Sequence, residues 1–192
     1  MPKIVDHEER RQQIVDAFLT LVERGRGLDA ASSRALAAQL GVSNSLLWRY
    51  FDDMDAIVER AYREVVARTN ARIERGIAGR RGLDAVHALI DELMPVASVS
   101  QAEARIVVAY WAAKVRDRRS YVEPHNCWRV KLVDFLEQAC ELGEVADDCP
   151  VQVLADAVVD IVDNAQVEFA MSEDEHTALA ARDLARAIVR LH

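Results

Sequence analysis

Apolar side chains recur every three or four residues along most of the chain, which is the spacing of a buried stripe on an α-helix. Between residues 8 and 24 the stripe is Ile14, Ala17, Phe18 and Leu21. Similar stripes run through 52–74, 83–94, 121–142 and the stretch after Pro150, with short glycine-, proline- or serine-containing segments between them. The pattern predicts an all-α protein of about nine helices.

The stretch from Ser32 to Phe51 predicts two short helices joined by a tight turn. Ser32 or Ser33 can cap a helix over 34–40, Gly41 can adopt the left-handed conformation that ends it, and Ser43 can cap a second helix over 43–50. This arrangement is typical of a helix-turn-helix, whose second helix enters the major groove of DNA. We therefore expect a DNA-binding domain over 1–55 and a larger helical domain over 56–192.

Two further helix starts are predicted from capping boxes, in which a serine is followed three residues later by glutamate. Ser100 with Glu103 predicts the start of the sixth helix, and Ser172 with Glu175 predicts the start of the ninth. A glycine at 143 is a suitable end for the seventh helix, and Asp52 or Asp53 can cap the fourth.

The chain is acidic as a whole but basic near its beginning. The chain has 24 Lys and Arg against 32 Asp and Glu, a formal net charge of −8, which argues against nucleic acid as a partner. Between residues 10 and 51, however, six arginines face only three acidic side chains. A local basic footprint matters more for phosphate binding than the sum over the whole chain.

The segment 41–51, Gly-Val-Ser-Asn-Ser-Leu-Leu-Trp-Arg-Tyr-Phe, resembles the TetR family of bacterial transcription regulators, whose signature is a glycine turn before a recognition helix that ends in an aromatic pair. The resemblance is specific over residues 10 to 60. It implies that Arg34, Asn44, Ser45 and Leu46 read base edges, chemistry that suits guanine, adenine and the thymine methyl group. It also implies phosphate contacts, which we assign to Arg10, Arg11, Ser33, Ser43, Trp48 and Tyr50. Met54 stands where the family usually has a phosphate-binding lysine.

The larger domain is the expected place of a small-molecule effector. Much of the aromatic content lies in the sixth and seventh helices, and the segment 109–113, Ala-Tyr-Trp-Ala-Ala, is similar to the choline-responsive regulators of betaine synthesis within the family. The candidate pocket residues are Met94, Tyr110, Trp111, Trp128, Phe135 and Asp163. Aromatic walls suit a hydrophobic or quaternary-ammonium ligand, although core packing explains the aromatics equally well. Asp163 either faces this pocket to receive a cation or belongs to a solvated acidic stripe.

The last two helices are expected to pair with a second copy of the chain, because their apolar faces suit a four-helix dimer interface. The candidate interface residues are Leu154, Val158, Ile161, Leu184 and Ile188. The resemblance places the dimer contact in the same two helices.

Other function classes find little support in the sequence. The three cysteines have no zinc-ligand spacing, no nucleophile elbow or phosphate-cradling glycine loop is present, and neither a metal nor a cofactor is expected. No segment has the roughly 18 apolar residues of a membrane span and the first residues lack a signal-peptide core, so we expect a cytoplasmic protein.

We therefore expect a homodimeric, ligand-responsive transcriptional regulator, more specifically a repressor of pseudo-palindromic double-stranded operator DNA that a small hydrophobic or cationic effector releases. An enzyme is not expected. The alternative is a helical protein-interaction module that keeps this fold without DNA binding, which the acidic net charge and Met54 favour.

Overall fold

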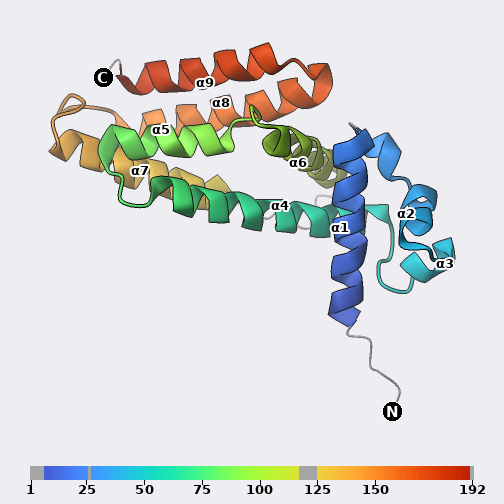
Figure 1. Ribbon diagram of the computed structural model, residues 1–192. Helices are drawn as coiled ribbons and strands as arrows, with labels where there is room; N and C mark the ends of the chain where they lie inside the picture. The colour runs from blue at the N-terminus through green and yellow to red at the C-terminus, as the bar shows by residue number, and fades with distance from the viewer. Residues whose placement is uncertain (1–6, 26, 117–124, 191–192) are drawn as a thin grey trace. The chain divides into compact units, whose positions relative to one another are not determined.

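The computed structural model describes residues 7–25, 27–116 and 125–190, and within them it contains α-helices and one 3₁₀ helix but no strand. The elements are α1 (His7–Gly25), the 3₁₀ helix η1 (Leu28–Ala31), α2 (Ser33–Leu40), α3 (Asn44–Leu47), α4 (Met54–Ile77), α5 (Gly82–Leu93), α6 (Ser98–Arg116), α7 (His125–Glu141), α8 (Val151–Ser172) and α9 (Glu175–Arg190). The prediction of an all-α protein with about nine helices is confirmed (Figure 1).

The chain divides into two compact units. The first falls within Met1–Val65 and Arg105–Arg119, and the second within Val66–Ala104 and Ser120–His192. Both divisions lie inside helices, so α4 and α6 each contribute one part to the first unit and one part to the second.

The first unit is built on α1, against which η1 and α2 pack, while α3 packs on α2 (Figure 1). Its most buried side chains include Phe18 of α1, Leu36 of α2, Leu47 of α3 and Ile57 of α4. These positions recur at helical spacing, and burying each large apolar side chain contributes roughly 1.5–3 kcal/mol. The short α3 is thus held by its one fully buried leucine.

Within the first unit, α4 and α6 are joined by an aromatic stack and an ion pair. The rings of Tyr62 and Tyr110 lie nearly parallel with centroids 3.9 Å apart, and both side chains are buried. Lys114 Nζ lies 5.3 Å from the centroid of Tyr110 and 2.7 Å from a carboxylate oxygen of Glu59.

The second unit has an apolar core formed by α5, α7, α8, α9 and the last turns of α4. In it α8 and α9 run side by side in opposite directions, and α5 and α7 pack against each other (Figure 1). The centre of the core is fully buried and consists of aliphatic side chains such as Leu89, Ile90, Leu132 and Leu136.

A polar network crosses the second unit from α4 to α5 and α6. Arg72 Nη1 and Nη2 donate to the two carboxylate oxygens of Glu103 at 2.9 and 2.7 Å, and Arg72 Nε donates to Glu92 at 3.2 Å. Arg72 Nη2 also donates to Thr69 Oγ1 at 3.2 Å. Glu103 and Thr69 are buried, and the Glu103 ion pair holds the pKa of Arg72 above its usual value.

This network explains why the predicted capping box at Ser100 and Glu103 is wrong. The sixth helix begins earlier, at Ser98, so Glu103 lies in its second turn and turns its carboxylate to Arg72. The Ser100 hydroxyl donates to the Ala97 carbonyl at 2.9 Å instead of capping an amide.

The second predicted capping box is wrong for a related reason. Ser172 is the last residue of α8, and Asp174 caps α9 by accepting a hydrogen bond from the His176 amide at 2.9 Å. The predicted end of the seventh helix is confirmed, because Gly143 has φ of 68° and its amide donates to the Cys140 carbonyl.

Candidate DNA-binding interface

The corner between α2 and α3 is fixed by a serine cap and a glycine turn. Of the two candidate caps, Ser32 fulfils the role, since its Oγ accepts a hydrogen bond from the Ala35 amide at 3.4 Å. Gly41 ends α2 with φ of 65°, a conformation that glycine adopts without steric cost. The Val42 amide then donates to the Ala37 carbonyl at 3.0 Å, which satisfies the end of the helix.

The second helix of this motif is shorter than the predicted 43–50. After Leu47 the chain continues as tight turns, in which the Arg49 amide donates to Leu46 and the Tyr50 amide donates to Leu47. Ser43 precedes α3, but its hydroxyl lies 3.0 Å from the Ser45 hydroxyl and caps no amide.

The side chains predicted to read bases lie at the beginnings of α2 and α3. Arg34, Asn44 and Ser45 are exposed, and Leu46 is half-buried. Within the described part of the chain, neither Arg34 nor Asn44 forms a hydrogen bond or an ion pair. Both side chains therefore keep their donors and acceptors for a ligand, and these are the groups that can bridge guanine and adenine edges.

The side chains predicted to bind phosphates fall into two groups. Ser33, Ser43 and Trp48 belong to the α2–α3 motif, and Trp48 is 38% exposed. Arg10 and Arg11 lie on α1, where Arg10 Nη1 donates to Gln13 at 2.7 Å. The structure therefore places both groups in the first unit.

Arg11 has a structural contact that the sequence did not predict. Its Nε donates to the Tyr50 carbonyl at 3.0 Å, and its guanidinium lies 5.8 Å from the centroid of the Phe51 ring. The ring of His7, one helical turn before Arg11, lies 5.0 Å from the Tyr50 ring. Helix α1 thus holds the segment that follows α3. Sequence reasoning missed His7, although its spacing of four residues from Arg11 places both on one helix face.

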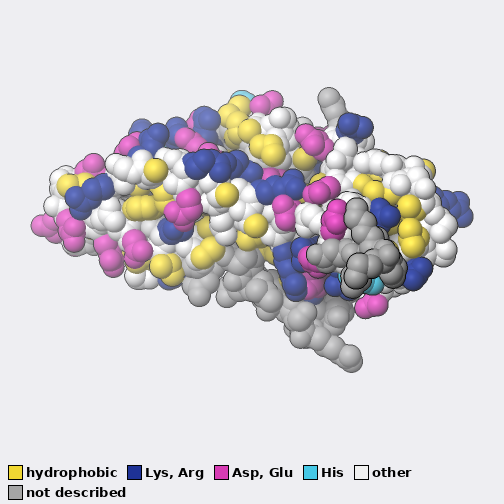
Figure 2. Space-filling model, turned by 60° about the horizontal axis from the view of Figure 1, so that its bottom comes forward, with side chains coloured by type: hydrophobic (Ala, Val, Ile, Leu, Met, Phe, Trp, Pro, Cys, Tyr) yellow, Lys and Arg dark blue, Asp and Glu magenta, His cyan; other side chains and the backbone are white. Residues whose placement is uncertain are grey.

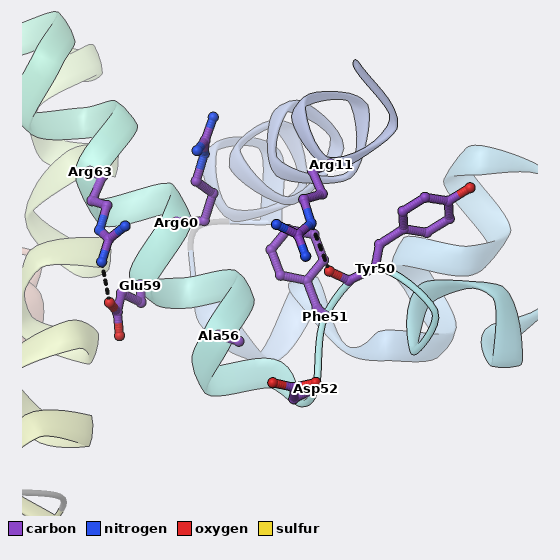
Figure 3. Close-up of a pocket in the computed structure, with 8 residues that line it drawn as sticks. All are labelled: Arg11, Tyr50, Phe51, Asp52, Ala56, Glu59, Arg60 and Arg63. Carbon is purple, nitrogen blue, oxygen red and sulfur yellow. Dashed lines mark hydrogen bonds and ion pairs between the residues drawn. The ribbon is translucent and has the colours of Figure 1, made fainter. Parts of the chain in front are cut away.

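A hollow of about 280 Å³ opens beside Tyr50 in the first unit (Figure 3). It is lined by Arg11 of α1, by Tyr50, Phe51 and Asp52, and by Ala56, Glu59, Arg60 and Arg63 of α4. Glu59 accepts from Arg63 at 2.6 Å and pairs with Lys114, whose hydrogen bond lowers the pKa of that carboxyl. The lining of the hollow therefore includes three arginines, one from α1 and two from α4.

The beginning of α4 is acidic. Asp53 Oδ1 accepts a hydrogen bond from the Ala56 amide at 2.8 Å, which confirms a predicted cap. Asp52, Asp53 and Asp55 are exposed there, and Met54 is half-buried. Three carboxylates at this end repel a phosphate, so the first turn of α4 is a poor substitute for the missing lysine contact.

The candidate effector residues are divided between the two units. Tyr110 and Trp111 belong to the first unit, where Tyr110 is stacked on Tyr62. Met94, Trp128, Phe135 and Asp163 belong to the second, where Met94 and Trp128 are part of the apolar core and Phe135 packs against it. Trp128 Nε1 donates to Asn70 Oδ1 at 2.6 Å, so its indole is fixed to α4.

Asp163 is the titratable residue of this group. It lies on α8, largely out of water, and burial together with the nearby charge of Asp160 raises the pKa of Asp163 to about 7. A carboxyl group with this pKa changes charge near neutral pH, and such shifts are common at functional sites.

The candidate dimer residues differ in how much surface they offer. Leu154 and Val158 are buried in the core of their own unit and present almost no area to a second chain. Leu184 is 53% exposed, and Ile161 and Ile188 are half-buried. Val153 and Met171 of α8, which the sequence did not single out, are also exposed.

Basic and acidic side chains are interspersed on the face drawn in Figure 2. No helix of the described chain is long and apolar enough to cross a bilayer. Nor do the described residues bring three or more His, Cys, Asp or Glu side chains together in a way that could hold a metal ion.

Two short helices joined by a glycine turn, with exposed Arg and Asn side chains at their first residues, are typical of a helix-turn-helix protein of the transcription-regulator class. The sequence model described as "Bacterial regulatory proteins, tetR family" matches residues 24–61. The regulator PksA of Bacillus subtilis is 32% identical over 152 residues, covering 77% of this chain and 73% of that protein. The chain therefore belongs to the TetR family of DNA-binding transcriptional regulators.

Other relatives extend this comparison over the whole chain. The regulator BetI of Proteus mirabilis is 23% identical over 96% of this chain and 92% of its own. A regulator from Saccharomonospora viridis, solved in complex with choline, has a TM-score of 0.77 at 17% identity and covers 92% of this chain and 95% of that one. At that identity the likeness shows a common fold.

Proposed function

We propose that this protein is a homodimeric repressor that binds pseudo-palindromic operator DNA and is released by a small cationic effector. The observation that carries the proposal is the pair of exposed, unengaged side chains, Arg34 and Asn44, at the starts of α2 and α3. A dimer would present two such units to successive major grooves, roughly 34–36 Å apart along the duplex.

Selection of bound fragments from random duplex DNA tests the DNA-binding part. The expected result is a palindromic consensus whose half-sites lose specificity in Asn44→Ala and Arg34→Ala, at roughly 1–3 kcal/mol of discrimination each. Arg24→Ala, at the exposed C-terminal end of α1, is the matched control. A complete lack of affinity at low salt would favour the protein-interaction module instead.

The dimer is proposed to form through the exposed parts of α8 and α9, with Leu184 at its centre and Ile161 and Ile188 beside it. Sedimentation equilibrium tests this, since Leu184→Arg places a charge in the contact and should yield monomers. Val115→Arg on α6, where Val115 is 79% exposed against 53% for Leu184, is the control that should leave the dimer intact. A dimeric Leu184→Arg variant would contradict this interface.

The effector is proposed to be a small cation such as choline, held beside Asp163. The partly buried carboxyl of Asp163 supports this, as does the choline bound to the structural relative from Saccharomonospora viridis. Because the ionised carboxylate attracts the cation, choline should bind more tightly as the pH rises through about 7. Calorimetric titration of wild type, Asp163→Asn and the exposed control Asp156→Asn measures this. Equal affinities in all three proteins would exclude Asp163 from the site.

Release of the repressor from DNA is explained by thermodynamic linkage between choline binding and DNA binding. If choline and operator DNA favour different arrangements of the dimer, each must weaken the binding of the other by the same factor. A reporter gene placed behind the selected operator distinguishes repression from activation. Induction by choline in wild type and its loss in Asp163→Asn are the expected results.

A further inference from the structure

The hollow beside Tyr50 has more hydrogen-bond donors than the protein itself uses (Figure 3). A guanidinium group carries five N–H donors on three nitrogens. Among the residues that the structure describes, Arg11 is engaged through Nε alone, which donates to the Tyr50 carbonyl. Within the same residues, Arg60 and Arg63 each donate through Nη2 alone, with Glu8 and Gln12 as acceptors for Arg60 and Glu59 for Arg63. Two nitrogens of each group therefore have no acceptor in the described part of the chain.

The internal contacts also hold these three groups in position. Arg11 is tied to backbone and lies over Phe51, while Arg60 bridges α4 to α1 through Glu8 at 2.5 Å. Arg63 is 65% exposed and is anchored at one end by Glu59. Donors that are already oriented lose less conformational freedom when an anion arrives.

The carboxylates of the hollow reduce its positive charge without cancelling it. The lining holds three arginines against Asp52 and Glu59, a difference of one positive charge. Glu59 is shared between Arg63 and Lys114, which adds a cation next to the wall, and Arg60 pairs with Glu8, which adds a carboxylate, so the difference of one positive charge remains. In Figure 3, Asp52 lies at the edge of the hollow beside Ala56.

We propose that this hollow binds a backbone phosphate of DNA and takes over the contact that the acidic start of α4 cannot make. The inference rests on the proposed function, since it requires that the first unit binds DNA. The hollow adjoins Tyr50, itself a predicted phosphate ligand, and continues from it along α4 to Arg60 and Arg63. Its volume of about 280 Å³ admits a phosphate group with part of its sugar. Bidentate guanidinium contacts are the usual protein partners of phosphate.

The test is the salt dependence of binding to a random-sequence duplex, measured by fluorescence anisotropy with the full chain. The logarithm of the association constant falls with the logarithm of salt concentration by about 0.9 for each phosphate that is neutralised. Arg63→Gln and Arg60→Gln should each lower the magnitude of this slope by about one and weaken binding several-fold to every sequence. Asp52→Asn should strengthen binding, because it removes a negative charge from the edge.

Arg24→Gln is the matched control, because Arg24 lies thirteen residues from Arg11 on the same helix, about 20 Å away. Thermal unfolding of each variant verifies that it folds, and Arg11 is left intact because it positions Tyr50.

Wild-type binding with unchanged slopes in both arginine variants overturns this inference and leaves the proposed function standing. No wild-type binding at low salt overturns both. Inorganic phosphate that raises the melting temperature of wild type but not of Arg60→Gln or Arg63→Gln, with unchanged DNA slopes in both variants, assigns the hollow to a free phosphate anion instead.

Discussion

The two units use arginine in opposite ways. In the second unit Arg72 donates from all three nitrogens, to Glu92, Glu103 and Thr69, and only 20% of its side chain is exposed. Within the described part of the first unit, Arg60 and Arg63 each donate from a single nitrogen, and their side chains are 36% and 65% exposed. Because all three residues are arginines, Arg72 differs from Arg60 and Arg63 in the number of its hydrogen-bond partners and in its burial.

This contrast separates an arginine that holds the fold from one that is free to bind. Breaking a buried ion pair leaves a charge out of water without compensation, which is costly, whereas an exposed pair contributes little. Arg72 uses four of its five N–H donors within its own unit, so little of this guanidinium is left for a ligand. Arg72 therefore stabilises the second unit, whereas the arginines of the hollow are the ones proposed to bind phosphate.

The largest expected effect is that of Arg72→Met. The variant leaves the buried carboxylate of Glu103 uncompensated, and we expect a loss of about 3 kcal/mol in the free energy of unfolding. For a chain of this size each kcal/mol lowers the melting temperature by about 2–4 °C. Arg60→Met should cost less than about 1 kcal/mol. Equal melting temperatures for the two variants would show that the contrast has no energetic basis.

The next largest effect distinguishes the two carboxylates bound by Arg72. Glu103→Gln removes the charge from the buried, doubly hydrogen-bonded partner and should cost about 2 kcal/mol. Glu92→Gln alters a single 3.2 Å contact on a side chain that is one-third exposed, and should cost less than about 1 kcal/mol. Urea unfolding of both variants measures the difference. The reverse order would mean that Glu92 is the principal partner of Arg72.

The sequence predicted much of the fold because helical periodicity and caps are local properties. Ser32, Gly41, Asp53 and Gly143 all act as predicted, since each satisfies backbone groups within a few residues. The capping box at Ser100 and Glu103 failed because a residue far along the chain, Arg72, takes the carboxylate. Local patterns do not record such competition between distant partners.

The same limit applies to the candidate site. The first turns of α2 and α3 could be predicted, because exposure there follows from the motif itself. The role of Arg11 could not, because its acceptor, the Tyr50 carbonyl, is 39 residues away. Leu154 and Val158 are predicted at a dimer contact because they share the apolar side of α8, and packing within the unit leaves them only 5% and 0% exposed. Periodicity identifies an apolar stripe and does not say which neighbour covers it.

The carboxylates of Glu103 and Asp163 differ in their partners. Arg72 binds that of Glu103, whereas burial and the nearby charge of Asp160 raise the pKa of the partly buried Asp163 to about 7. Between pH 4 and 7 the folded state holds a proton at Asp163 that the unfolded state releases. The contribution of Asp163 to the free energy of unfolding is therefore fully present below about pH 4 and is lost as the pH rises through 7.

Because Asp163 is only partly buried, we expect this loss to total about 1–2 kcal/mol. Urea unfolding of wild type and Asp163→Asn at pH 5 and 7.5 measures it, and the variant should lack this component of the pH dependence. Asp156→Asn, exposed and paired with Arg129, serves as the control for a charge removed from α8. Identical pH dependence in wild type and Asp163→Asn would contradict the raised pKa.

The smallest expected effect concerns the ion pair between Arg60 and Glu8, which joins α4 to α1 at 2.5 Å. A double-mutant cycle with Arg60→Gln and Glu8→Gln should give a coupling free energy of about 0.2–1 kcal/mol in low salt, and close to zero at 1 M salt, where the screening length is about 3 Å. The corresponding cycle for Arg72 and Glu103 should keep most of its coupling at 1 M, because the pair is shielded from ions. If the Arg60 coupling survived high salt, Arg60 would be a structural residue like Arg72, and its free donors would be the only remaining argument for a role in binding.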